Sequence, residues 1–253
     1  MHIDVQELRR FYYRSQLGKL AQRSIRVAMA GHWGEGRGGN LAGFGFAAPF
    51  LRPFKSKAQR CISLMPAQQG AFHWPVEADN VSVLVEEPRW PLATGFVDNL
   101  IVAHAIENSD RPDVVLSECH RVLAPGGRAL IVAPNRTGLW ARRDVTPFGH
   151  GRPFSLGQLE RQLRANALEP VAHSAALYAP PSARRFWLRS AGLAERLGRR
   201  LGAERLAGAI LVEVVKTAYA APRGGAAVSA KSRLEVLGGI GAPAPKPVTG
   251  RHS

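Results

Sequence analysis

The chain has 253 residues, of which 45% are hydrophobic, and its formal net charge is +15. This length suits one large α/β domain or two small ones, and the hydrophobic fraction is ordinary for a globular core. The sequence contains no run of about 18 uncharged apolar residues, which excludes a membrane-spanning helix.

The positive charge comes mostly from arginines that are scattered along the chain in short pairs. No motif of interleaved aromatic and basic residues accompanies these pairs. This favours a solvated, arginine-rich surface over a nucleic-acid-binding footprint. Weak, sequence-indifferent binding to nucleic acid is kept as an alternative, as are an acidic partner and a membrane surface.

Cys61 and Cys119 are the only cysteines, and neither has the spacing of a metal ligand. Each lies in an apolar segment, so two buried free thiols in a reducing compartment are expected, with no metal site. Residues 1–20 are polar throughout and do not resemble a signal peptide. A cytoplasmic location is therefore expected.

Strand-like and helix-like segments alternate along most of the chain. Residues 4–30 predict an amphipathic helix with a break near Gly18. Strands are predicted at residues 40–46, 60–64, 80–86, 96–104, 128–135, 168–178 and 209–219. Further helices are predicted at residues 111–123, ended by the Ala-Pro-Gly-Gly that follows, at 155–166, with Ser155 as N-cap, and at 182–201. The alternation predicts an α/β fold with a doubly wound, mostly parallel seven-stranded sheet.

Three regions follow from this pattern. Residues 1–35 are expected to form a helical segment packed on the domain, and residues 36–220 to form the domain itself. Residues 221–253 are rich in Gly, Ala, Pro and basic residues and have no sustained apolar period. This composition predicts a disordered basic tail.

The stretch "GFGFAAP", residues 43–49, begins like a ligand-binding turn from a first strand to a first helix. In an open α/β sheet, ligands bind beyond the carboxyl ends of the strands, where the strand order reverses. Glycine in that turn lets the backbone approach a ligand and adopt positive φ. Ala47, Ala48 and Pro49 stand where a third glycine would be expected, so this loop alone is a weak signal.

The segment from Glu86 to Asn135 carries a more specific series of motifs. Glu86 is followed by "WPL" at 90–92, "VD" at 97–98, "HAIEN" at 104–108, "RVLAPGG" at 121–127 and "APN" at 133–135. In order and spacing these motifs resemble those of the class I S-adenosylmethionine-dependent methyltransferases, specifically the type 11 branch. The resemblance spans about residues 36–178. It implies a Rossmann-like methyltransferase fold, S-adenosyl-L-methionine as cofactor and methylation as the activity.

The resemblance places the family's glycine loop on residues 41–49. Gly43 then takes the position of an aspartate and Gly45 that of the first glycine. Ala47 and Pro49 replace the other two glycines. Pro49 fits the first turn of a helix, where its missing N–H costs nothing. A loop with two glycines is therefore expected still to accept the cofactor.

The cofactor contacts implied by the resemblance are Gly43 and Gly45 at the methionine end, Met65 beside the ribose and adenine, Glu86 near the adenine amino group, and His104. The family's acid at the end of the second strand is missing here. Its loss is expected to cost about 1–3 kcal/mol of binding free energy. Replacing Gly45 by a bulky residue is expected to abolish cofactor binding and leave the fold intact.

His104 and His150 are the catalytic candidates. His104 is expected over the methyl-donor pocket, where it would orient the substrate, and a packed histidine bonded to backbone is the alternative. His150 lies with Arg152 and Phe154 in the segment after the fifth strand, which covers the substrate in related enzymes. A loop that only packs on its own domain is the alternative there. Glu107 is predicted to fix a loop or a helix start.

The function predicted from sequence is an S-adenosylmethionine-dependent methyltransferase with an unidentified acceptor, for which a small molecule is the candidate. Positioning of the two reactants supplies most of the catalysis in such a transfer, so the lack of a recognisable triad is no argument against an enzyme. The alternatives are a degenerate methyltransferase fold that acts as a binding or regulatory module, and a basic nucleic-acid-binding protein. The oligomeric state is left open.

Overall fold

A computed structural model of the chain describes residues 3–34, 38–142 and 145–217. Its strands are β1 (Asn40–Gly45), β2 (Arg60–Pro66), β3 (Ser82–Val85), β4 (Val97–Ala103), β5 (Leu123–Pro134), β6 (Leu168–Ala176) and β7 (Ala209–Lys216). Its α-helices are α1 (Val5–Arg9), α2 (Gln16–Trp33), α3 (Ala48–Lys55), α4 (Pro112–Val122), α5 (Leu156–Ala165) and α6 (Arg185–Arg200).

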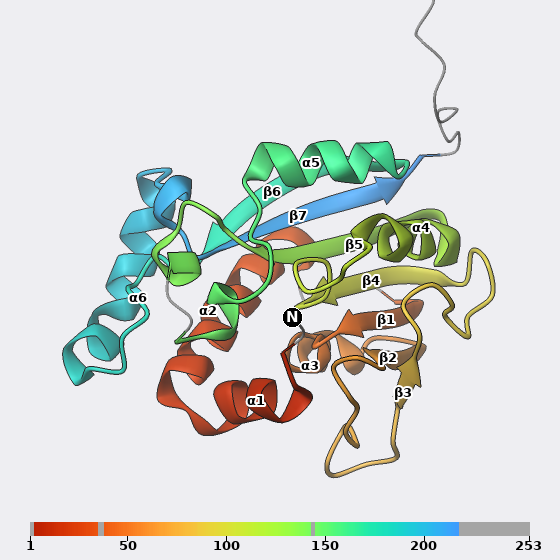
Figure 1. Cartoon of the computed structure of the whole chain (residues 1–253), viewed down its shortest axis with the longest axis horizontal. Coiled ribbons are helices and arrows are strands. Elements are labelled where there is room, and N and C mark those ends of the chain that lie inside the picture. The colour runs from red at the N-terminus through yellow and green to blue at the C-terminus, as the bar shows by residue number, and fades with distance from the viewer. Residues whose placement is uncertain (1–2, 35–37, 143–144, 218–253) are drawn as a thin grey trace, which may run out of the picture. The chain divides into compact units, whose positions relative to one another are not determined.

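The strands form one seven-stranded sheet in the order β3-β2-β1-β4-β5-β7-β6 (Figure 1). Strands β1 to β5 pair in parallel, whereas β7 is antiparallel to both of its neighbours, β5 and β6. The predicted α/β class and the mostly parallel seven-stranded sheet are confirmed.

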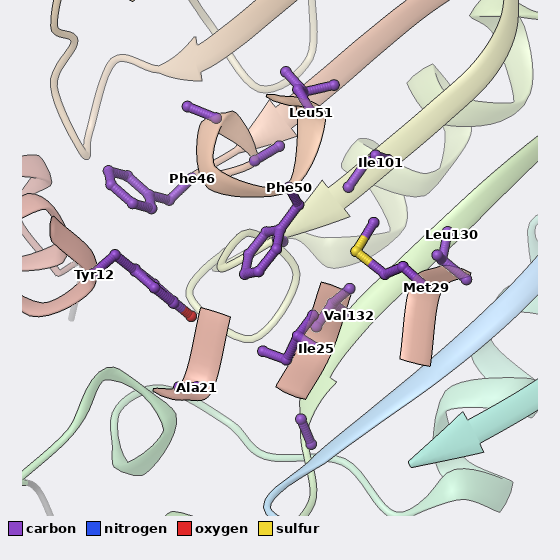
Figure 2. Close-up of a cluster of buried hydrophobic side chains, with 14 of the residues drawn as sticks. Tyr12, Ala21, Ile25, Met29, Phe46, Phe50, Leu51, Ile101, Leu130 and Val132 are labelled. Atoms are coloured by element: carbon purple, nitrogen blue, oxygen red, sulfur yellow. The ribbon is translucent and has the colours of Figure 1, made fainter. Parts of the chain in front are cut away.

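Helices cover both faces of the sheet, because alternate residues of each central strand point to opposite sides. In β4, Ile101 belongs to the core cluster with α2 and α3, whereas Leu100 and Val102 belong to the cluster with α4 and α5. Figure 2 shows part of the first cluster, in which Ile25 of α2 lies near Val132 and Met29 of α2 lies near Leu130. The sheet is therefore doubly wound, as expected for strands that are apolar on both sides.

The N-terminal helical segment breaks at Ser15, three residues before Gly18 and close to the predicted position. A five-residue π-helix, Arg10–Arg14, follows α1, and Ser15 then caps α2 by accepting a hydrogen bond from the N–H of Gly18 at 2.8 Å. Gly18 lies inside the first turn of α2, where a side chain would overlap the carbonyl oxygen of Phe11. The glycine thus permits close packing of two helical turns and does not end a helix.

The Ala-Pro-Gly-Gly of residues 124–127 lies inside β5, although the sequence predicted a stop between helix and strand. Helix α4 ends at Val122, and β5 begins at the next residue. Gly126 has a φ of 76°, and a Cβ at Gly127 would lie 2.9 Å from the carbonyl oxygen of Val97. Both glycines are therefore required by the backbone path at the start of the strand.

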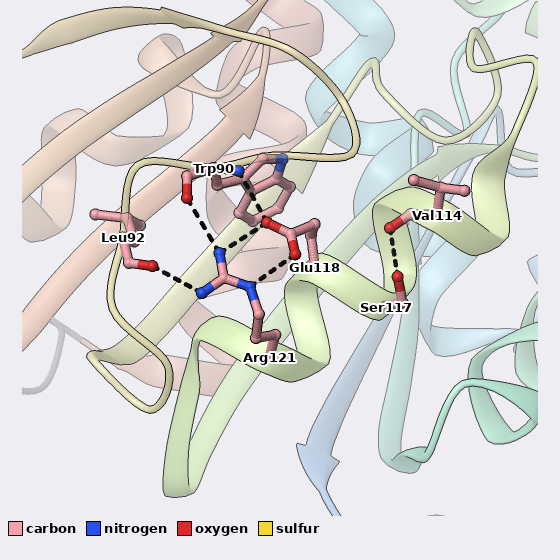
Figure 3. A network of polar contacts seen from close by, with 6 residues as sticks. All are labelled: Trp90, Leu92, Val114, Ser117, Glu118 and Arg121. Atoms are coloured by element: carbon pink, nitrogen blue, oxygen red, sulfur yellow. Dashed lines mark hydrogen bonds and ion pairs between the residues drawn. The ribbon is translucent and has the colours of Figure 1, made fainter.

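A polar network ties α4 to the loop that carries "WPL" (Figure 3). Arg121 donates to both carboxylate oxygens of Glu118 at 2.7 Å and to the carbonyl oxygens of Trp90 and Leu92. Glu118 also accepts from the N–H of Trp90 at 2.8 Å. The Trp90 ring stacks on Phe44 of β1. Two motifs of the family resemblance thus hold one another in place.

Several smaller expectations are also decided by the structure. Ser155 caps α5 with a full capping box, as predicted. Cys61 and Cys119 are free, but only Cys119 is fully buried; burial raises the pKa of the half-buried Cys61 thiol to about 11. Within the described residues, none of the helices has the length and apolarity needed to cross a membrane. The predicted tail lies outside the described residues, and the division into three regions stays a prediction.

Candidate functional site

The strand order reverses between β1 and β4, and the family's glycine loop lies there, at the carboxyl end of β1. Gly45 has a φ of 79°, and the next N–H, that of Phe46, donates to the carbonyl oxygen of Ala103 at 2.8 Å. A side chain at Gly45 would overlap that oxygen. A Cβ at Gly43 would lie 2.7 Å from the Cβ of Ala47. Both glycines are needed by the fold, so the expectation that Gly45 can be replaced without harm to the fold is wrong.

Aromatic side chains fill the space over this loop. Tyr12, Phe46, Phe50, Phe72 and Phe148 are all buried, and we call this group the aromatic cap. The ring of Tyr12 stacks on Phe46 at 5.6 Å between centroids and meets Phe50 edge-on (Figure 2). Phe72 lies 5.6 Å from Phe46 on the other side. The cap joins the N-terminal helical segment to the loops after β1, β2 and β5.

A polar cluster lies beneath the cap, in the turn after β4. The hydroxyl of Tyr12 and Nε2 of His104 are 2.6 Å apart, and Nδ1 of His104 lies 3.3 Å from Oε1 of Glu107. Burial raises the pKa of Tyr12 well above its ordinary value, and the negative charge of Glu107 adds to this effect. His104 has a φ of 50°, in the left-handed region that non-glycine residues rarely adopt.

Several buried polar atoms of this cluster lack hydrogen-bond partners. His104 and Glu107 are each 2% exposed. Neither Nδ1 of His104 nor either oxygen of Glu107 makes a hydrogen bond within the described part of the chain. The same holds for Oδ1 of Asn108. Buried polar atoms are nearly always hydrogen-bonded, so a group of them without partners indicates a place built to meet something else. Glu107 contacts the loop after β5 through its backbone, since its carbonyl oxygen accepts from the N–H of Arg152 at 2.8 Å, whereas its side chain makes no such bond.

The other predicted site residues divide into two groups. Met65 is buried under the cap, where its sulfur accepts from the N–H of Phe72 at 3.4 Å. Half-buried His150 and exposed Arg152 lie in the loop after β5, and the N–H of Arg152 donates to the carbonyl oxygen of Glu107. Glu86, in contrast, is exposed, and only its backbone pairs with Arg89 in an isolated β-bridge. The structure gathers Gly43, Gly45, Met65 and His104 around the cap and leaves Glu86 outside it.

Sequence reasoning missed the residues that make the cap. Tyr12 contacts His104, which lies 92 positions further along the chain, and no local sequence pattern predicts such a contact. The only signal was the aromatic run "FYY" at residues 11–13, which is apolar enough to need a buried partner. His104 bonds to this tyrosine, so the alternative of a histidine bonded to backbone does not describe its ring.

An open cavity of about 660 Å³ adjoins the cap at Phe72. Five cations line it: Arg9, Arg10, Arg14, Arg52 and Lys55. The guanidinium of Arg9 lies 4.9 Å from the centre of the Phe72 ring, and Glu77 is the one carboxylate among the lining residues. Within the described residues these five cations form no ion pair. We call this space the basic cavity.

Comparisons with known proteins agree with this architecture. The family model described as a methyltransferase domain matches residues 43–131. Over 52 residues the chain is 46% identical to the ubiquinone/menaquinone biosynthesis C-methyltransferase UbiE of Rubrivivax gelatinosus. That match covers 21% of this chain and 21% of the relative, so it spans about a fifth of the relative's length.

Solved methyltransferase structures share the fold. An S-adenosylmethionine-dependent methyltransferase from Thermotoga maritima aligns with a TM-score of 0.57 at 18% identity, over 84% of this chain and 96% of that one. The geranyl diphosphate C-methyltransferase of Streptomyces coelicolor, solved with S-adenosyl-L-homocysteine, aligns with a TM-score of 0.51 at 17% identity, over 77% of each chain. The chain thus matches a methyltransferase-domain model over residues 43–131 and shares the fold of solved S-adenosylmethionine-dependent methyltransferases.

The residues at the site have a chemistry that suits the cofactor of these methyltransferases, but they leave little space for it. A buried carboxylate without hydrogen bonds and a glycine loop at the reversal of strand order suit a ligand that carries an ammonium and a sulfonium. The aromatic cap, however, occupies the space over the loop. Any cofactor bound there has to displace part of the cap, and Tyr12 and Phe46 are the side chains that lie over the polar cluster and the loop.

Proposed function

We propose that this protein is an S-adenosylmethionine-dependent methyltransferase that binds its cofactor at the carboxyl ends of β1 and β4 and acts on a small-molecule acceptor. The observation that supports this most directly is the buried pair His104 and Glu107 at the point where the strand order reverses, in which Nδ1 of His104 and both oxygens of Glu107 lack hydrogen bonds. The family match over residues 43–131 supports the same proposal.

The roles of the residues follow from their chemistry. When bound, the cofactor supplies an activated methyl group on a sulfonium. The Gly45 turn lets the backbone approach the ligand, and Glu107 provides an acceptor for its cationic end. His104 is the group placed to take a proton from an acceptor that must lose one. The cap, once it closes again, excludes water from these charges and so strengthens their interactions.

A closed cap lowers the apparent affinity for the cofactor, because only the open fraction of the molecules binds. Calorimetric titration with S-adenosylmethionine and S-adenosylhomocysteine tests this. We expect wild type to bind weakly and Phe46→Ala, which shortens the cap, to bind at least about tenfold more tightly. Phe54→Ala is the matched control, because Phe54 is equally buried in α3 but packs on Trp33, outside the cap. It should bind as wild type does.

Glu107→Gln completes this experiment. Removing the carboxylate is expected to weaken cofactor binding about tenfold or more, because a charge-assisted contact is lost while the shape is kept. If wild type and Phe46→Ala both give no heat at millimolar ligand, the cofactor site proposed here does not exist. The binding-module alternative would then describe the protein.

We place the acceptor in the basic cavity, which adjoins the cap and carries five cations against one carboxylate. These charges favour an acceptor with a phosphate or carboxylate group, and the rings of Phe72 and Trp74 offer it an apolar wall. Titration with inorganic pyrophosphate as the probe should show binding that falls about tenfold in Arg52→Glu. Arg161→Glu, on the exposed side of α5, should have no effect. Equal loss in both variants would show a general charge effect and no site.

A further inference from the structure

Helix α6 has an inner face that is fixed by the rest of the domain. Ala191, Glu195 and Gly198 are buried, and α6 lies beside α2. Glu195 accepts from the N–H of Tyr178 at 2.8 Å, and Gly198 lies directly against the Tyr178 ring. Glu195 is the only acidic residue of the helix. The carboxylate is therefore turned inward, and no acidic side chain is left on the outer face.

The outer face of α6 carries a row of exposed apolar side chains. Phe186, Leu193, Leu197 and Leu201 at its end are 70%, 56%, 47% and 77% exposed. Their spacing of seven, four and four residues puts them on one side of a helix, opposite the buried residues. We call this row the apolar stripe. Large apolar side chains in such a continuous row mark an interaction surface.

A row of arginines runs beside the apolar stripe. Arg185, Arg189, Arg196 and Arg200 repeat at a similar helical spacing, about a quarter of a turn away from the stripe. None of the four forms an ion pair within the part of the chain that the structure describes. A groove of about 720 Å³ between α6 and α2 adds further cations, Lys19, Arg23 and Arg199.

We propose that α6 binds the surface of a membrane that contains anionic lipids, with the apolar stripe inserted at the level of the headgroups. A helix with one apolar face and an arginine-rich flank lies in the interface in this way, and the arginine side chains reach up to the phosphates. The aromatic pair Phe186 and Trp187, with ring centres 5.2 Å apart, stands at the start of the stripe and suits the same layer.

Two other binding partners for the outer face of α6, a nucleic acid and a second copy of the chain, fit less well. A nucleic acid would neutralise the arginines but leave the stripe in water. A second copy of the chain would cover the stripe but bring one arginine row against another, with no carboxylate on the outer face to offset the repulsion. An anionic lipid surface satisfies the apolar side chains and the cations at once.

Co-sedimentation of the full chain with vesicles tests the proposal. We expect binding to phosphatidylcholine vesicles that contain about one third phosphatidylglycerol, weaker binding to phosphatidylcholine alone, and loss of the difference at high salt. Leu193→Glu combined with Leu197→Glu should lower the partition coefficient at least about tenfold. Arg189→Glu combined with Arg196→Glu should do the same, since each arginine near the surface contributes about fivefold.

Matched controls separate insertion from a general change of charge. Val76→Glu alters a valine that is 74% exposed, far along the chain from α6, and Arg161→Glu alters an exposed arginine of α5. Both should bind vesicles as wild type does. Two results would overturn the proposal: unchanged vesicle binding in the Leu193/Leu197 variant, or a dimer in light scattering that this variant dissociates. The proposal holds whether or not the cofactor binds, because none of these measurements uses it.

Discussion

Two buried glutamates within the family resemblance, Glu107 and Glu118, have very different surroundings. Glu118, in α4, has both oxygens occupied by Arg121 and by the N–H of Trp90. Glu107, in the turn after β4, has neither oxygen hydrogen-bonded within the described residues. The Glu118 carboxylate ties α4 to the loop that carries "WPL", whereas the Glu107 carboxylate is only enclosed by the residues around it. Glu118 therefore contributes hydrogen bonds to the stability of the fold, whereas the side chain of Glu107 does not.

The largest effect should come from cutting the network of α4. Arg121→Met removes all the hydrogen bonds of the guanidinium and leaves Glu118 without its cation. We expect a loss of about 2–3 kcal/mol in the free energy of unfolding, measured by urea denaturation. Arg161→Met, at an exposed position, should change stability by less than about 0.5 kcal/mol. A loss below about 1 kcal/mol in Arg121→Met would mean that the network does not hold the "WPL" loop.

The same substitution at the two glutamates tests the comparison directly. Glu118→Gln should destabilise the fold by about 1–2 kcal/mol, because charge-assisted bonds are weakened. Glu107→Gln should leave stability unchanged or raise it, because a buried carboxylate without partners is costly. Urea midpoints of the two variants measure the difference. Equal losses would show that Glu107 has a structural partner after all.

The smallest effect is in the pH dependence of Glu118. Burial alone would raise the pKa of this carboxyl, but the hydrogen bonds from Arg121 and Trp90 outweigh it and lower the pKa below its ordinary value. A lowered pKa means that the stabilisation is complete above the unfolded value of about 4.3 and is lost as the pH falls through the folded value. The stability gap between wild type and Glu118→Gln should therefore be full at neutral pH and close in acid. A gap that stays constant below about pH 3 would contradict this assignment.

The scaffold was predictable because its signals are local. Strand β5 is nearly all apolar, and Ser155 with Gln158 forms a capping box that can be read from the sequence. The site was only partly predictable. The position of the site followed from the order of the motifs. Whether aromatic side chains cover it, however, depends on contacts between distant segments, such as Tyr12 with His104. The end of α4 was predicted to within one residue, but the role of the following Gly127 was not, because its close contact is with Val97 of the neighbouring strand β4.

The antiparallel pairing of β6 with β7 has a consequence for the length of the segment that connects these two strands. Neighbouring antiparallel strands can be joined by a turn of two residues, whereas parallel neighbours need a long crossover. The chain nevertheless places residues 177–208, including α6, between these two strands. The pairing of the strands does not require this long connection. The connection can therefore be lengthened, shortened or exchanged without a change in strand order. In this respect α6 is an insertion between the two strands of a hairpin. A chain with a short turn in place of α6 should still assemble the seven strands.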